Sequence, residues 1–487
     1  MASFKKNYFY QIIYEVLAIC LPLITAPYIA RVLGDVNLGV FSYTHSIANI
    51  FLTIARLGII NHGSRSIALY QKDKEERSKI FWEIYSVQAV STILLTIAYL
   101  VYIALFVTEN QFIAYLQVVL VVSALFDIGW LYMGMENFKK TVTKNIFVKL
   151  LSLVCIFAFV RSRNDLWIYT LVSTGSMLLG YATLWLGFSK EFKWVCPKLC
   201  GIKKQIKPIL VLFIPAIAVI LYTIMDKVML GGICGTTEVG YYEQAAKLVA
   251  VPLGFITSFG AVMLPRMSAM EKEGGAEKAS QNITTNSLIF MVCLSSAITF
   301  GLSAISETLI PIYYGSEFLA CIPLLVMISM KLPVMAWANV VRTQCLIPKH
   351  RDKEYIISLF VGAGVNVVFN MILIPKLAAV GAAIGTILAE TAVCLVQTVF
   401  ARDILQTKKA LLKSVGFVFI GAIMLAFVKM VMAVMPTSPI ITLVIGIGCG
   451  VIVYTLLAFA YYCAVVERKK PDVVIKKLLS SLKKKKA

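Results

Sequence analysis

Charged side chains lie inside several long apolar stretches of this sequence, where charge is costly. Arg56, Lys227 and Lys247 fall within such stretches, and Arg31 stands at the end of another. A Lys or Arg in the middle of a membrane costs about 2.5–3.5 kcal/mol on insertion scales. These side chains should therefore face a wet interior or an acidic partner. A cavity lined by them would be cationic and would suit an anionic cargo.

Three acidic residues in apolar stretches are candidates for ion coupling. Asp127, Asp226 and Glu390 could carry a proton or bind sodium, as intramembrane acids do in transporters. They could equally balance the charge of a basic residue on another helix. Asp226 directly precedes Lys227, but neighbours on a helix do not face each other, so we expect no direct pair between these two.

Signatures of catalysis and of metal binding are missing from the sequence. It contains no Walker motif, no nucleophile–base arrangement and no ligand spacing typical of a metal site. Cys196 and Cys200 form an isolated C-x3-C without a second pair or a histidine, which is weak support for zinc. We therefore expect no cofactor, no metal and no enzymatic activity.

The composition indicates the elements that must position these residues. The 487-residue chain is 59% hydrophobic and 15% charged, with a mean hydropathy of +0.84. Soluble proteins are roughly 45–50% apolar and about a quarter charged. The sequence therefore predicts an all-α, multi-pass membrane protein. Apolar runs of about 20 residues predict about fourteen transmembrane helices, near 9–30, 38–60, 80–107, 112–135, 142–160, 166–188, 207–230, 239–264, 286–311, 318–346, 355–374, 378–401, 411–434 and 440–466.

The distribution of basic residues predicts the orientation. With the N-terminus in the cytoplasm, 36 of the 46 Lys and Arg residues fall in inside segments and 4 in outside loops. Inside loops of membrane proteins carry such an excess. We therefore expect both termini in the cytoplasm and the protein in the cytoplasmic (plasma) membrane. The net charge of +21 thus mostly reflects the orientation of the chain in the membrane. The lysine-rich tail would lie near membrane lipids rather than nucleic acid.

An internal repeat predicts two lobes. Segments one and seven both carry proline and end in Leu-Gly, and the next segments open at Gly39 and Gly240, about 200 positions apart. Such repeats are typical of two-lobed transporters. The predicted parts are two pseudo-symmetric six-helix lobes around a central cavity (1–188 and 207–402), a linker (189–206), two C-terminal helices (403–466) and a basic tail (467–487).

Several stretches together resemble a known family. In order they are Leu21-Pro-Leu-Ile-Thr-Ala-Pro-Tyr-Ile-Ala-Arg-Val-Leu-Gly34, residues 126–140, Asp226-Lys-Val-Met-Leu-Gly231 with residues 238–244, Met263-Leu-Pro-Arg266, and residues 366–383. The chain resembles the Wzx-type polysaccharide repeat-unit flippases of the polysaccharide transport family in the MOP exporter superfamily. The resemblance is strongest to those of Gram-positive capsule and exopolysaccharide pathways.

This resemblance implies a function in polysaccharide biosynthesis. The cargo would be an undecaprenyl-diphosphate-linked oligosaccharide, moved from the inner to the outer leaflet by alternating access. The repeat-unit polymerase and glycosyltransferases would be candidate partners. Arg31, Arg56, Lys227 and Lys247 would grip the diphosphate and saccharide. Arg31 falls on the matching position of the family, whereas Arg56 stands where relatives more often carry a small residue.

Two other functions remain open at this point. One is an ion-coupled multidrug or cation antiporter of the same superfamily, which a cationic cavity disfavours because cationic drugs need acids. The other is a membrane-embedded polysaccharide polymerase or ligase. Such an enzyme would need a sizeable outer loop, and the predicted outer loops are short.

Overall fold

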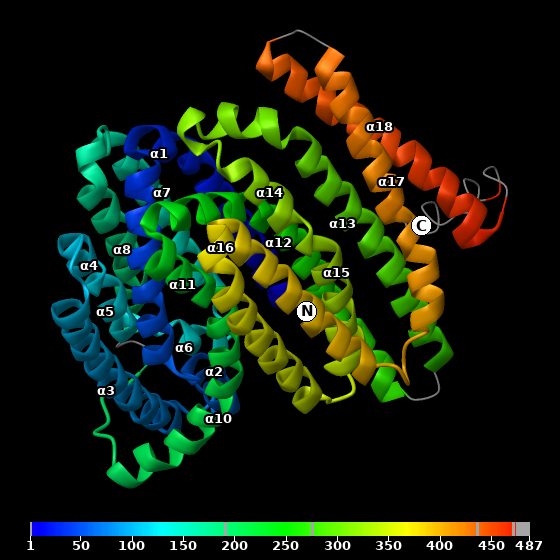
Figure 1. The fold of residues 1–487 in the computed structure, drawn as a ribbon. Helices are drawn as coiled ribbons and strands as arrows, with labels where there is room; N and C mark the ends of the chain where they lie inside the picture. The colour runs from blue at the N-terminus through cyan, green and yellow to red at the C-terminus, as the bar shows by residue number, and fades with distance from the viewer. Residues whose placement is uncertain (1, 189–191, 274–276, 435–437, 470–472, 474–487) are drawn as a thin grey trace. The chain divides into compact units, whose positions relative to one another are not determined.

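The structure, a computed structural model, describes residues 2–188, 192–273, 277–434, 438–469 and 473. Side chains are described from Leu21 onward, except at 138–140, 222 and 273. Most of the predicted basic tail and the first residues of the linker lie outside this range. The described residues form helices and no strand (Figure 1).

The helices follow one another along the chain with short connections. In order they are α1 (Ala2–Arg56), α2 (Ile59–Leu69), α3 (Lys74–Phe106), α4 (Gln111–Leu116), α5 (Val118–Phe126), α6 (Gly129–Gly134), α7 (Phe138–Phe159), η1 (Arg163–Asp165), α8 (Leu166–Ala182), η2 (Thr183–Trp185), α10 (Leu199–Thr223), α11 (Met225–Cys234), α12 (Thr236–Glu273), α13 (Glu277–Tyr313), η3 (Ser316–Phe318), α14 (Cys321–Ser329), α15 (Lys331–Val341), η4 (Arg342–Leu346), α16 (Asp352–Phe400), α17 (Thr407–Val434), α18 (Pro439–Tyr461) and η5 (Tyr462–Glu467).

Many of these helices can cross a membrane. Within the described residues, 11 helical segments are long and apolar enough to do so, which makes the chain a multi-pass membrane protein. Two of the segments, Leu21–Leu69 and Asp352–Phe400, are 49 residues long. At about 1.5 Å per residue a straight helix of this length would be about 73 Å long, more than twice the roughly 30 Å hydrocarbon core. The all-α membrane fold is confirmed, and the count of fourteen helices stays a prediction.

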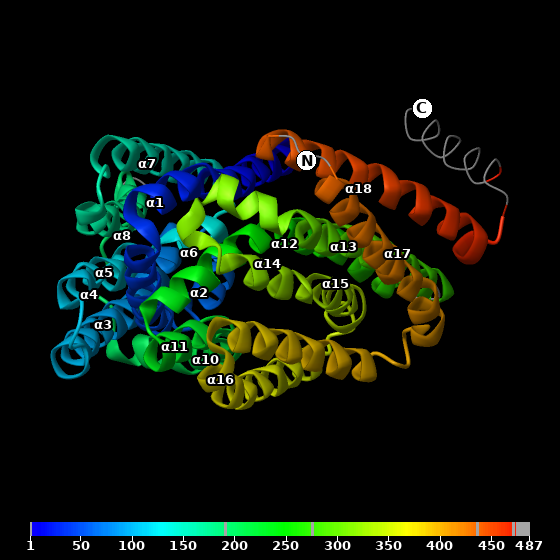
Figure 2. The same cartoon turned by 45° about the horizontal axis from the view of Figure 1, so that its top comes forward.

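Both of these long segments contain a break in helical geometry where the sequence predicts a boundary. In α1 the break is Gly34, with φ 78° and ψ 176°. Glycine adopts positive φ without steric cost, so this residue suits the break. In α16 the break is Ala378, with φ 47° and ψ −129°, a conformation that an L-residue with a side chain rarely adopts. Figure 2 shows α1 (blue) changing direction along its length.

The chain forms two compact units. The first contains residues 1–244 and 370–382, and the second contains residues 245–369 and 383–487. Helices α12 and α16 each contribute residues to both units. The predicted division into lobes at 188 and 207 stays a prediction.

In the first unit, the two repeat-related glycines touch. A Cβ atom on Gly240 would lie 2.9 Å from the Cα of Gly39, closer than real side chains approach. One residue further along α12, the Tyr241 hydroxyl donates a hydrogen bond to Asp35 Oδ2 at 2.5 Å. The start of α12 therefore crosses α1 backbone to backbone, just after the Gly34 break.

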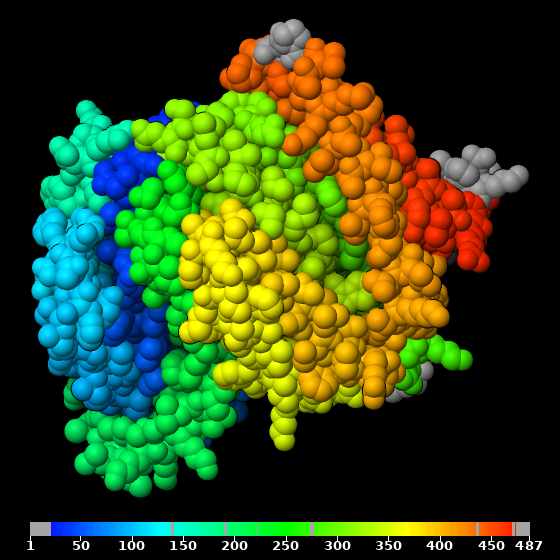
Figure 3. Space-filling view, viewed as in Figure 1, coloured from blue at the N-terminus to red at the C-terminus, as the bar shows by residue number. Residues whose placement is uncertain are grey.

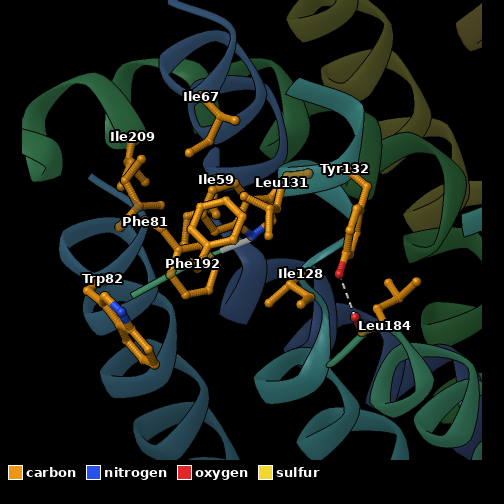
Figure 4. Close-up of a cluster of buried hydrophobic side chains, with 12 residues drawn as sticks. Ile59, Ile67, Phe81, Trp82, Ile128, Leu131, Tyr132, Leu184, Phe192 and Ile209 are labelled. Atoms are coloured by element: carbon orange, nitrogen blue, oxygen red, sulfur yellow. Dashed lines mark hydrogen bonds between the residues drawn. The ribbon is translucent and has the colours of Figure 1, made fainter. Parts of the chain in front are cut away.

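An aromatic cluster fixes the helices around α2 in the first unit. Phe81 and Trp82 of α3 pack with Trp130 of α6 and with Phe192, and Tyr132 donates to the carbonyl of Leu184 at 2.7 Å (Figure 4). Burying aromatic side chains of this size is a large apolar contribution to stability. Because α2 follows Arg56 and α6 follows Asp127, this cluster holds the two segments that carry the charged residues.

The second unit contains a separate core formed by α13, α17 and α18. Its buried residues include Ile289, Phe417 and Tyr454, and the Tyr454 hydroxyl donates to the carbonyl of Cys293 at 2.7 Å. Apolar side chains of these three helices also line a groove of about 940 Å³. The outer side chains of α17 (orange) and α18 (red) lie at the surface of this unit (Figure 3), as expected for helices that face lipid.

Candidate functional site

Arg56, at the end of α1, forms an ion pair inside a membrane-spanning segment. Its Nη2 lies 3.0 Å from Asp127 Oδ2, and the two side chains are only 18% and 10% exposed. The same Nη2 donates to the Tyr181 hydroxyl at 2.5 Å, and the guanidinium lies over the Tyr181 ring, 5.0 Å from its centroid. Tyr181 belongs to α8, so three distant segments meet at this cation.

A helix break places Asp127 opposite Arg56. Asp127 stands between α5 and α6 with an extended backbone, and its Oδ1 accepts a hydrogen bond from the Gly129 amide at 3.1 Å. Gln88 of α3 donates to the Asp127 carbonyl at 2.9 Å and accepts from Trp130 at 3.0 Å. Freed backbone groups in a membrane must be satisfied internally. Gln88 does this here for the backbone carbonyl of Asp127, while the Gly129 amide bonds the carboxylate.

Lys227 forms the second intramembrane pair of the first unit. Its Nζ lies 2.5 Å from Glu243 Oε2, with both side chains 22% exposed. The pair joins α11 to the start of α12. Sequence reasoning missed Glu243 as a site residue. Its signal was present in the sequence, because Glu243 lies in the repeat motif that opens at Gly240 and is the first acid of the predicted helix 239–264.

Asp226 has different neighbours from Lys227, as predicted for adjacent helix residues. Asp226 is 2% exposed, and its carboxylate accepts hydrogen bonds from Tyr242 at 3.0 Å and from Asn370 at 2.7 Å. Asn370 comes from the short part of α16 that belongs to the first unit. Asp226 is therefore a buried carboxylate with two neutral donors, which is the kind of group that could exchange a proton or a cation.

Arg31, Lys247 and Glu390 are the remaining predicted site residues. Arg31 is exposed on α1, three residues before the Gly34 break. Lys247 is half-buried in α12, and Glu390 is buried in α16; both belong to the second unit. The structure thus brings Arg56 together with Asp127, while a single cavity shared by all four cations stays a prediction.

Residues able to hold a metal ion do not cluster in the described part of the chain. The described residues contain no group of three or more His, Cys, Asp and Glu side chains placed to hold a metal ion. Cys196 and Cys200 are both exposed free thiols. The chemistry available at the site is that of cations, carboxylates and neutral hydrogen-bond donors.

Comparison with known proteins agrees with this description. The sequence model of a family described as polysaccharide biosynthesis protein matches residues 4–271. The putative O-antigen transporter of Escherichia coli (strain K12) is 24% identical over 415 residues, which are 82% of this chain and 97% of that protein. The resemblance inferred from the sequence motifs is thereby confirmed. This relative is named as a transporter and not as an enzyme, in agreement with the prediction of no enzymatic activity.

Solved structures show the same fold. The lipid II flippase MurJ in an inward closed conformation superposes with a TM-score of 0.73 at 16% identity, covering 94% of this chain and 99% of that one. An outward-facing multidrug resistance MATE family transporter of the MOP superfamily gives a TM-score of 0.54 at 14% identity, covering 80% of this chain and 92% of that one. The chain therefore shares its fold with these two transporters.

Proposed function

Because the chain belongs to the polysaccharide biosynthesis protein family, we propose that it is a flippase for undecaprenyl-diphosphate-linked oligosaccharide. It would move repeat units from the inner to the outer leaflet of the cytoplasmic membrane, for capsule or exopolysaccharide synthesis. The name of its E. coli relative, an O-antigen transporter, supports a glycan cargo. The repeat-unit polymerase and the glycosyltransferases are its proposed partners.

The proposed transport cycle is alternating access between two lobes, residues 1–188 and 207–402. Both termini lie in the cytoplasm in this proposal, as the excess of basic residues in the inside segments indicates. The breaks at Gly34 and Ala378 support it, because hinge motions need a few positions that absorb a change in backbone angle.

The main support for the proposal is that the guanidinium of Arg56 has a buried hydrogen-bond donor left over. A guanidinium has five N–H donors, and the described contacts of Arg56 use its Nη2. Its Nε is buried with no hydrogen-bond partner among the described residues. A buried donor of this kind is costly unless a ligand or water completes it. Since guanidinium binds phosphate strongly and with two parallel hydrogen bonds, a diphosphate group supplies the missing acceptor.

Exchange of anions at Arg56 gives the site a simple mechanism. Without cargo, Asp127 balances the guanidinium. When the diphosphate binds Arg56, the carboxylate of Asp127 loses its partner in a place where an unpaired charge is costly. Uptake of one proton by Asp127 neutralises it. Cargo binding would thereby be linked to proton binding, and this assigns Asp127 its predicted coupling role.

The other predicted residues extend the same scheme. Lys227, paired with Glu243, is set up for a similar exchange, and we assign Arg31 and Lys247 to contacts with the diphosphate or saccharide. Asp226 and Glu390 are the proposed coupling residues away from Arg56. For Asp226 the support is its burial and its two neutral donors. Asp226→Asn should leave cargo binding intact and lower ion-driven transport at least tenfold.

Binding of the cargo to purified protein is the direct test. We expect wild-type protein to bind undecaprenyl-diphosphate-linked oligosaccharide, and Arg31→Ala, Arg56→Ala, Lys227→Ala and Lys247→Ala to weaken it. Losing a hydrogen-bonded charge contact of about 2 kcal/mol corresponds to about thirtyfold in Kd. Lys429→Ala is the matched control, since Lys429 also lies in a spanning helix but forms an exposed pair with Glu307. The proposal is contradicted if wild-type protein does not bind the cargo, or if none of the four substitutions changes its Kd.

Proton uptake tests the mechanism separately from the cargo. In weakly buffered solution with a pH indicator, wild-type protein should take up about one proton per cargo bound. Asp127→Asn should bind cargo without proton uptake. If both proteins take up the same number of protons per cargo bound, the exchange at Arg56 is excluded, whereas the proposal that the protein binds this cargo still stands.

A cation antiporter is the second candidate, and the buried carboxylates favour it. Asp226 and Glu390 are 2% and 6% exposed, and acids of this kind bind cationic substrates in membranes. This function predicts that proteoliposomes exchange ethidium for protons and that Asp226→Asn abolishes the exchange. The flippase proposal predicts no ethidium transport.

A further inference from the structure

Helix α10 carries a groove of its own on one side. The groove has a volume of about 540 Å³, and every described residue that lines it belongs to α10: Lys203, Ile206, Lys207, Leu210, Val211, Phe213, Ile214 and Ile217. None of the residues that we assign to cargo or coupling contributes to it. The groove is therefore a separate feature that the proposed flippase mechanism does not use.

The two ends of the groove differ in chemistry. Lys203 and Lys207 lie one helical turn apart at one end, on the same face of the helix, and both are exposed. Beyond Lys207 the lining is apolar and open, with Leu210, Val211 and Ile214 being 48%, 56% and 45% exposed. The groove thus presents two cations followed by an apolar track, which matches the chemistry of a phospholipid with an anionic headgroup.

Two prolines explain why a single helix has a concave side. Pro208 and Pro215 both lie inside α10, two turns apart and therefore on one face. A proline ring clashes with the preceding turn, so the helix opens on the proline side and bends toward the other. At 3.6 residues per turn, the middle of the groove, formed by Ile206, Leu210 and Ile217, lies on the side opposite to both prolines. The bend of α10 is visible in Figure 1.

The length of the groove corresponds to one leaflet. At about 1.5 Å of rise per residue, α10 extends about 21 Å from Lys203 to Ile217. A bilayer including its headgroups is about 40–45 Å thick, so one leaflet is about as thick as the groove is long. The lysines then lie at the level of the phosphates and Ile217 lies near the midplane. An undecaprenyl chain is much longer than such a track, whereas a phospholipid acyl chain fits it.

The residues before the groove also suit the membrane surface. Trp194 and Leu199 are 74% and 75% exposed, next to Lys193 and Lys198. Exposed aromatic and apolar side chains interleaved with lysines are typical of segments that lie in the headgroup region. The linker and the groove would therefore contact the same leaflet.

We propose that this groove binds one anionic phospholipid. The phosphate lies between Lys203 and Lys207, and an acyl chain follows Leu210, Ile214 and Ile217 toward the midplane. The bound lipid fixes the start of α10, and with it the linker between the predicted lobes, to one leaflet.

Native mass spectrometry of the full-length protein in detergent tests this site with defined lipids. We expect phosphatidylglycerol to bind at least tenfold more tightly than phosphatidylcholine. The double variant Lys203→Ala/Lys207→Ala should bind phosphatidylglycerol about thirtyfold more weakly, because each lysine near a phosphate contributes about 1 kcal/mol, which is about fivefold in affinity. Ile214→Trp, which fills the track and leaves the charge unchanged, should weaken it as well.

The controls separate this site from general attraction and from the cargo. Lys408→Ala/Lys409→Ala removes two exposed lysines at the start of α17 and should leave binding unchanged. Inorganic phosphate should not displace the lipid. The proposal is overturned if phosphatidylglycerol and phosphatidylcholine bind with equal affinity, or if Lys408→Ala/Lys409→Ala weakens phosphatidylglycerol binding as much as Lys203→Ala/Lys207→Ala does. It is also overturned if undecaprenyl phosphate displaces phosphatidylglycerol at equal concentration.

Discussion

The pair formed by Arg56 and Asp127 should contribute more to stability than a surface ion pair. Its side chains are 18% and 10% exposed, and removing one partner of a buried pair costs about 3–5 kcal/mol because the other charge stays behind. Since some exposure remains, we expect Arg56→Ala to lower the free energy of unfolding by about 3 kcal/mol. In an Asp127→Asn background the same substitution removes the Tyr181 contacts and no ion pair, so it should cost about 1 kcal/mol.

A double-mutant cycle measures the difference, a coupling energy of about 2 kcal/mol. The assay is equilibrium unfolding of the four proteins in mixed detergent micelles at neutral pH. The control cycle uses Lys79 and Glu76, an exposed pair on α3 with both side chains 46% exposed, for which we expect about 0.5 kcal/mol or less. A coupling energy for Arg56 and Asp127 within the range of this control would refute the reasoning. The double variant should also remain folded yet fail to bind the diphosphate lipid, which separates the structural role of Arg56 from its proposed cargo contact.

Three further predictions address the backbone and the connections between helices. Gly240→Ala forces the crossing of α1 and α12 apart and should cost about 1–3 kcal/mol in thermal unfolding, whereas Gly232→Ala, at a position with open space around it, should stay within about 0.5 kcal/mol of wild type. Ala378→Gly removes the penalty of φ 47° and should stabilise the protein by about 1 kcal/mol; a lower unfolding temperature would contradict this. Arg351 donates to Asp403 and holds the pKa of that carboxyl below its ordinary value. A lowered carboxyl pKa contributes stability that is complete above the pKa of the unfolded chain and is lost as the pH falls through the pKa of the folded state. Asp403→Asn should therefore cost at most about 1 kcal/mol at pH 7, and its difference from wild type should shrink as the pH falls below about 4.

The helices and the charged residues could be predicted from the sequence, because both depend on local features. Runs of apolar residues predict spans, and the breaks at Gly34 and Ala378 fall at predicted boundaries. Likewise, the position of Arg56 inside an apolar stretch required a partner or a wet interior. The separate contacts of Asp226 and Lys227 followed from helix geometry alone.

The partners of the charged residues could not be predicted, because they are set by tertiary packing. Asp127 is 71 positions from Arg56, and nothing in the local pattern distinguishes it from Asp226 as a candidate ion-pair partner. Tyr181, which also contacts Arg56, looks like any aromatic residue of a spanning helix. The touching of Gly39 and Gly240 was likewise hidden, since a repeat in sequence indicates equivalent positions and not contact between them.

The crossing of α1 by the start of α12 also has a consequence for biosynthesis. The residues joined by the hydrogen bond from Tyr241 to Asp35 are 206 positions apart. At about 5–20 residues per second, α1 leaves the ribosome about 10–40 s before the segment that covers it. During that interval the face of α1 around Asp35 and Gly39 lacks its contact with α12. This face of α1 is therefore covered only once the second half of the protein has been synthesised.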